Sequence, residues 1–162
     1  MKKLIIFLIL NLGFLSLEAQ VSDFVLPDGK VIKVDDFYKP VLTDFIKSCA
    51  KYNIDFKRLS LLEGIYVSSN LEGRHGATRN DRKIILVNAD IPNYLPTFRK
   101  AVLYHELYHL LSLENGHVAF PYLVQDGGSI FPEYLIKHWD VVEAEYFLYL
   151  ASMYPNEKTP RN

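Results

Sequence analysis

The stretch Ala101-Val102-Leu103-Tyr104-His105-Glu106-Leu107-Tyr108-His109-Leu110-Leu111 decides how this sequence folds and where its chemistry lies. Its apolar residues recur at helical spacing, so we expect a helix over residues 97–113. Two histidines and a glutamate inside such an apolar helix would need partners, because burying polar groups without partners costs free energy. The stretch therefore predicts a core helix that carries a polar site.

The spacing of His105, Glu106 and His109 is typical of a metal site. Residues four apart lie on the same face of a helix, so His105 and His109 can present two imidazoles to one ion. Glu106 lies about 100° further round the helix, which brings its carboxylate beside the metal rather than onto it. Zinc lowers the pKa of a bound water to roughly 7, and a carboxylate in that position can accept the proton. We therefore expect His105 and His109 to bind zinc and Glu106 to act as the general base.

A third protein ligand is expected, because catalytic zinc usually has three and keeps one position open. His117 is the first candidate. Asn115-Gly116 is a helix-stop signal whose residues tolerate a left-handed backbone, and such a turn would bring His117 back towards the ion. Glu143, in the helix predicted over residues 140–153, is the competing third ligand.

The rest of the sequence alternates between strand-like and helix-like segments. Residues 24–26 and 31–34 flank the turn sequence Pro27-Asp28-Gly29-Lys30 and predict a hairpin. The other predicted elements are a helix over residues 40–52 and strands over residues 62–68 and 83–88, separated by a polar loop over residues 70–82. This order indicates an α+β fold, a small twisted sheet backed by helices.

From residue 84 to residue 132 the sequence resembles the zincin metallopeptidases, in particular small exported bacterial ones related to the metzincins. His105, Glu106 and His109 match their His-Glu-x-x-His helix. His117 matches their third histidine, although it follows His109 by eight residues instead of the usual six. The segment Gly128-Ser129-Ile130-Phe131-Pro132 resembles their Met-containing turn beneath the metal, with Phe131 in place of Met.

This resemblance implies a zincin-like fold, in which a small, twisted, mostly antiparallel sheet packs on helices. It also implies one zinc ion and hydrolysis of a protein or peptide substrate by a metal-activated water. The strand over residues 83–88 would lie along the cleft and pair with an extended substrate backbone. Two alternatives stay open: a zincin that uses Glu143 as third ligand, and a catalytically silent exported domain that serves as a binding or adaptor module.

The first residues indicate export. Lys2 and Lys3 precede an apolar run over residues 4–17, and Ala19 offers a small residue for cleavage, which is the layout of a secretory signal peptide over residues 1–19. We expect a single metallopeptidase domain over residues 20–162, located in the periplasm or outside the cell.

Composition limits the partners. Without the first 19 residues, which hold two Lys and one Glu, the chain has 16 basic and 18 acidic residues, a net charge of −2. That balance disfavours nucleic acid as a partner, and we expect a monomer with no membrane anchor after cleavage. Cys49 is the only cysteine and lies in a helical apolar pattern, so we expect a buried thiol.

Overall fold

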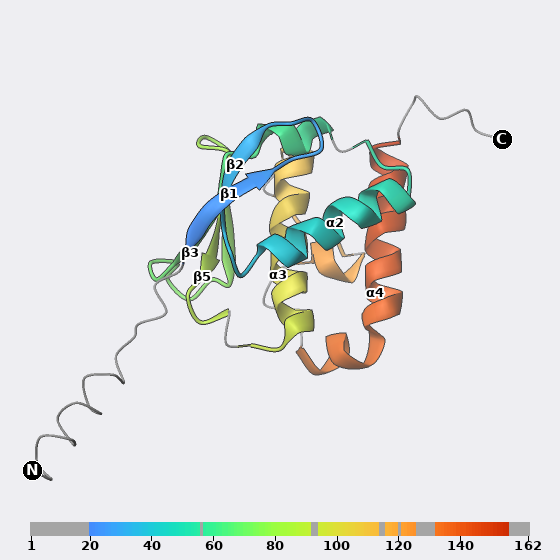
Figure 1. Ribbon diagram of the computed structural model, residues 1–162. Coiled ribbons are helices and arrows are strands. Elements are labelled where there is room, and N and C mark those ends of the chain that lie inside the picture. The colour runs from blue at the N-terminus through green and yellow to red at the C-terminus, as the bar shows by residue number, and fades with distance from the viewer. Residues whose placement is uncertain are drawn as a thin grey trace, which may run out of the picture.

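The computed structural model describes residues 20–55, 57–91, 94–113, 116–119, 121–125 and 132–155. They form a five-stranded sheet with the α-helices packed on one of its faces (Figure 1). The predicted α+β class is therefore confirmed. The elements in chain order are β1 (Val21–Val25), β2 (Val31–Asp35), α2 (Lys39–Lys51), the 3-10 helix η1 (Lys57–Leu61), β3 (Gly64–Ser68), β4 (Gly76–Arg79), β5 (Ile84–Asn88), α3 (Pro96–Ser112), the 3-10 helix η3 (Tyr122–Val124) and α4 (Pro132–Met153).

The sheet is mixed, with the strand order β1-β2-β3-β5-β4. β1 and β2 form the predicted hairpin, in which Val25 pairs with Val31. β4 and β5 are also antiparallel, whereas the pairs β2–β3 and β3–β5 are parallel. The sheet is thus evenly mixed, with two antiparallel and two parallel pairings, and not mostly antiparallel as expected. The crossover through α2 and η1 makes β3 parallel to β2, and the segment that contains β4 makes β5 parallel to β3.

The polar loop predicted over residues 70–82 contains an additional strand, β4. Ala77 pairs with Leu86 and Thr78 with Ile85, so β4 covers the outer side of β5. The expectation that the strand over residues 83–88 pairs with substrate is therefore wrong, since both sides of β5 are already paired. Among the described strands, β4 and β1 form the two edges of the sheet.

Helix α3 lies at the centre of the molecule, between the sheet and the other helices (Figure 1). Every residue over positions 101–112 is buried, which explains why its apolar residues occupy all sides of the helix. Tyr104 contacts α2 through the ring of Phe45, 5.2 Å between centroids, and its carbonyl accepts a hydrogen bond from Tyr146 Oη of α4 at 2.5 Å. The helix is thus held from several directions, which makes it a rigid support for a site.

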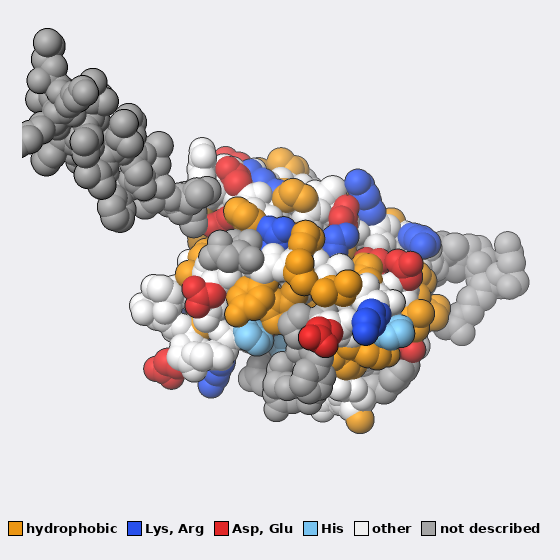
Figure 2. Space-filling model, turned by 90° about the horizontal axis from the view of Figure 1, so that it is seen from below, with side chains coloured by type: hydrophobic (Ala, Val, Ile, Leu, Met, Phe, Trp, Pro, Cys, Tyr) orange, Lys and Arg blue, Asp and Glu red, His pale blue; other side chains and the backbone are white. Residues whose placement is uncertain are grey.

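The N-terminal end of α3 has no polar cap. Leu95 precedes the helix and Pro96 occupies its first turn, where a missing N–H costs nothing. The ring of Tyr94 packs on Phe98 with 5.3 Å between centroids, which fixes how the chain enters the helix. Tyr94 and Leu95 remain about half exposed, and Figure 2 shows hydrophobic side chains gathered on the end of the molecule where α3 and α4 begin.

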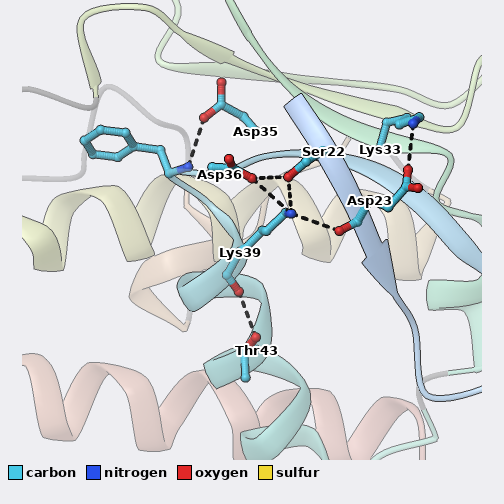
Figure 3. Close-up of polar contacts among 8 residues, drawn as sticks. Ser22, Asp23, Lys33, Asp35, Asp36, Lys39 and Thr43 are labelled. Atoms are coloured by element: carbon cyan, nitrogen blue, oxygen red, sulfur yellow. Dashed lines mark hydrogen bonds and ion pairs between the residues drawn. The ribbon is translucent and has the colours of Figure 1, made fainter. Parts of the chain in front are cut away.

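A polar cluster joins the hairpin to the start of α2 (Figure 3). Lys39 Nζ lies 2.9 Å from a carboxylate oxygen of Asp36 and donates to the carbonyl of Asp23 at 2.9 Å and to the hydroxyl of Ser22. Asp35 Oδ1 accepts a hydrogen bond from the backbone N–H of Phe37 at 3.0 Å. These contacts hold β1 and β2 in place against the helical layer.

Helix α4 begins at Pro132, earlier than the predicted residue 140. It bends at His138, where the backbone is not helical. Cys49 is fully buried, as expected, and burial raises the pKa of its thiol to about 12.

The predicted signal peptide and Phe131, with most of the turn that resembles the Met-turn, lie outside the described residues. No helix in the described ranges is long and apolar enough to cross a bilayer.

Candidate metal centre

The structure brings His105, His109 and His117 together. The Nε2 atom of His105 lies 3.1 Å from that of His109 and 3.2 Å from that of His117. The ligand atoms of all three residues lie within 4.8 Å of one another. His105 and His109 come from successive turns of α3 and are buried, whereas His117 comes from the segment that follows the helix and is exposed. Two of the three candidate ligands therefore lie in the core and the third lies at the surface.

Two of the distances between the ring nitrogens, both measured from His105, are close to those of a metal site. A tetrahedral zinc ion with Zn–N bonds of roughly 2.0–2.1 Å places its ligand nitrogens roughly 3.3–3.4 Å apart. The two observed separations, 3.1 and 3.2 Å, are close to that value. Three imidazole nitrogens suit a transition metal such as zinc better than calcium or magnesium, which prefer oxygen. The cluster is compatible with one metal ion.

A backbone carbonyl of η3 orients the first of the three rings. His105 Nδ1 lies 2.7 Å from the carbonyl oxygen of Leu123. A carbonyl oxygen only accepts, so Nδ1 carries the proton and the lone pair of Nε2 points into the cluster. This is the arrangement that fixes metal-binding histidines in other proteins.

The segment that returns His117 to the site begins with a left-handed residue. Leu113, directly after α3, has a left-handed backbone with φ of 58°. Glu114 and Asn115 lie outside the described residues, so the predicted stop at Asn115-Gly116 stays a prediction. Arg58 Nη1 donates to the carbonyl of Leu111 at 2.6 Å and so satisfies the end of the helix. The left-handed backbone of Leu113 costs roughly 1–2 kcal/mol, because its Cβ approaches the following carbonyl oxygen.

Glu143, the competing ligand, is not brought to the three rings. Its Oε1 accepts a hydrogen bond from Tyr104 Oη at 3.4 Å, between α3 and α4. The remaining two histidines also lie outside the group: His75 contacts the ring of Phe98, and His138 that of Tyr134. Of the candidate third ligands, the geometry favours His117.

Glu106 is buried beneath the edge strand β4. It is 5% exposed, and its Oε2 atom lies 2.8 Å from Thr78 Oγ1. The same hydroxyl is 2.8 Å from the backbone carbonyl of Glu106. Gly76, two residues earlier on β4, leaves room for the carboxylate, since a Cβ there would lie 2.7 Å from Glu106 Oε1. The carboxyl group is therefore enclosed by α3 on one side and β4 on the other.

Burial raises the pKa of Glu106 to about 7, because the charged form loses its hydration. The hydrogen bonds with Thr78 and the positive charge of Arg74 act in the opposite direction. A carboxyl group with a pKa near neutrality holds or releases a proton at physiological pH, which suits acid–base chemistry.

The raised pKa predicts a pH-dependent stability cost in the metal-free protein. The folded protein binds the Glu106 proton more tightly than the unfolded chain, so stability falls as the pH rises from about 4.5 to about 7. Above pH 7 the cost reaches about 3 kcal/mol. Urea unfolding measures this difference in the free energy of unfolding. At pH 8 we expect metal-free Glu106→Gln to be more stable than the metal-free wild type by about 3 kcal/mol. At pH 5 we expect a much smaller difference. An equal difference at both pH values would contradict the assignment.

Sequence reasoning missed three contributors to the site. Gly76 and Thr78 lie in a segment that was predicted to be a polar loop, and Leu123 contributes through its backbone alone. No residue pattern in a sequence indicates that a backbone carbonyl will contact a histidine ring. The β4 segment also lacks the alternation of apolar and polar residues that would indicate a strand.

Comparisons with protein-family models, curated proteins and solved structures found no match to this chain. The site and the fold therefore carry the functional argument. They define the protein as an α+β protein with a three-histidine cluster that is compatible with a metal ion.

Proposed function

We propose that this protein is a zinc-dependent metallopeptidase that hydrolyses peptide bonds, with His105, His109 and His117 as ligands and Glu106 as general base. The observation that carries the proposal is the convergence of the three Nε2 atoms beside a buried glutamate on the same helix. A structural site would need the ligands but not the glutamate. Zincs with purely structural roles are also usually held by four protein ligands, whereas this cluster contains three in the described residues.

Each residue has a defined task in this proposal. The three histidines would hold the ion, which when bound acidifies a water molecule and polarises the scissile carbonyl. Glu106 accepts the proton of the attacking water at its carboxylate and returns it to the leaving amine. Leu123 fixes the tautomer of His105 through its carbonyl.

The position of β4 at the edge of the sheet favours a peptide as substrate rather than a small molecule. Among the described strands, β4 is paired on one side only, with β5, and it contacts α3 at Glu106. An extended peptide can add to such an edge through main-chain hydrogen bonds. The expected substrate is therefore a segment of unfolded or extended protein, met in the compartment to which the predicted signal peptide leads.

A metal-removal experiment tests the proposal. The purified protein is stripped with a chelator, then supplied with zinc or magnesium, and assayed on an unfolded protein and a mixed peptide library. We expect one zinc per chain, cleavage that disappears on stripping, and recovery with zinc but not with magnesium, which prefers oxygen ligands. A zinc-loaded protein that cleaves nothing would instead support the alternative, an exported binding or adaptor domain.

A further inference from the structure

The contact between β4 and Glu106 has a consequence for the chemistry of the site. Glu106 is only 5% exposed, and its Oε2 atom accepts a hydrogen bond from the Thr78 hydroxyl at 2.8 Å. Hydrogen bonds between a hydroxyl and a carboxylate are stronger than those between neutral groups. The strand is thus bonded directly to the side chain on which the proposed reaction depends.

The neighbouring glycine restricts the same carboxyl group from another side. A Cβ at Gly76 would lie 2.7 Å from Glu106 Oε1, 2.8 Å from Cγ and 3.0 Å from Cδ. Real Cβ atoms essentially never come so close, so a larger residue at this position would displace the glutamate side chain or the strand. Gly76 and Thr78 together define where the carboxylate lies.

We propose that Thr78 is a positioning residue, which holds the Glu106 carboxylate in its reactive place through the Oγ1–Oε2 hydrogen bond, with Gly76 leaving the space that this place requires. The inference rests on the proposed peptidase function and deepens it. It makes the edge strand part of the proton-transfer apparatus as well as a place for substrate. Thr78 does not itself contact the reacting atoms.

The contact is also suited to hold a group that gains and loses a proton. A hydroxyl both donates and accepts, and Thr78 Oγ1 has a second acceptor within reach, the Glu106 carbonyl at 2.8 Å. The hydroxyl can therefore donate to the carboxylate, or accept from the carboxylic acid while it donates to the carbonyl. The side chain of Glu106 need not move between these two states.

Two substitutions at Thr78 separate the hydroxyl from the shape of the side chain. Thr78→Val keeps the volume, the β-branching and the backbone N–H but removes the hydrogen bond of the hydroxyl, and Thr78→Ser keeps the hydroxyl. For the zinc-loaded enzyme we expect Thr78→Val to lower kcat by about 10- to 100-fold, the scale of a misplaced catalytic group. KM and zinc content should stay unchanged, and Thr78→Ser should stay within about threefold of the wild type.

Thr43→Val is the matched control. Thr43 Oγ1 also donates one hydrogen bond at 2.8 Å, to the Lys39 carbonyl within α2, and its side chain is likewise partly buried. We expect this variant to keep the wild-type kcat. Full activity of Thr78→Val, or equal losses in Thr78→Ser and Thr78→Val, would overturn the role of the hydroxyl.

A crystal structure of Thr78→Val decides the same point without any turnover. We expect the Glu106 carboxylate to leave the position it has beside β4, or to occupy several positions, while the three histidines keep theirs. Gly76→Ala should displace the carboxylate as well. An unmoved Glu106 in Thr78→Val would overturn the inference, whereas a zinc-loaded wild type without cleavage would count against the proposed function alone.

Discussion

Replacement of Glu106 by Gln is expected to lower kcat on an unfolded substrate by about 10³-fold or more, while the protein keeps one zinc per chain. Glutamine has nearly the same shape and can still bond to Thr78, whose hydroxyl lies 2.8 Å from the carboxylate. It cannot accept the proton of the attacking water. The loss should therefore appear in kcat, with little change in KM or in metal content.

Glu143→Gln provides the matched control for this substitution. It makes the same chemical change on the adjacent helix α4, where Glu143 contacts Tyr104 instead of the histidines. We expect this variant to cleave at close to the wild-type rate. Glu106→Gln activity within tenfold of the wild type would contradict the role of Glu106 as base.

The second large effect is expected at the third ligand. His117→Ala should lower zinc affinity by at least about 100-fold. Removal of a residue that only orients a ligand typically lowers metal affinity by about 10- to 100-fold, and removal of a ligand should lower it further. Excess zinc should raise the melting temperature of the wild type, since a ligand at 1,000 times its Kd stabilises by about 4 kcal/mol. The melting temperature of His117→Ala should respond far less. Elemental analysis and thermal unfolding at fixed zinc concentrations measure both quantities.

Two substitutions outside the cluster control for the loss of a histidine and for the competing ligand. His138→Ala removes a ring that contacts Tyr134, and Glu143→Ala removes the carboxylate that contacts Tyr104. We expect both variants to keep zinc. Retention of zinc by His117→Ala together with its loss from Glu143→Ala would show that the ligand set is the alternative one.

The centre of the fold could be predicted from the sequence because its signal is local. The apolar residues around His105 and His109 predicted a helix over residues 97–113, and α3 spans Pro96–Ser112. The two histidines face each other because residues four apart lie on one side of a helix, which needs no knowledge of the rest of the chain. The α+β class followed from the order of strand-like and helix-like segments.

The features that the sequence did not reveal depend on distant contacts. β4 has only four residues, Gly76 to Arg79, and pairing with β5 together with the contact to Glu106 makes it a strand. Strand propensity depends strongly on such surroundings. Leu113, directly after α3, has a left-handed backbone, although leucine has no intrinsic preference for that conformation. The parallel pairing of β2, β3 and β5 likewise has no signature in any single segment.

The most direct test of the central claim is a zinc-edge X-ray measurement on crystals of the zinc-loaded protein. We expect one anomalous peak per chain, with the Nε2 atoms of His105, His109 and His117 each roughly 2.0–2.1 Å from the ion. A peak ligated by Glu143, a peak elsewhere on the chain, or no bound zinc at stoichiometric concentration would contradict it.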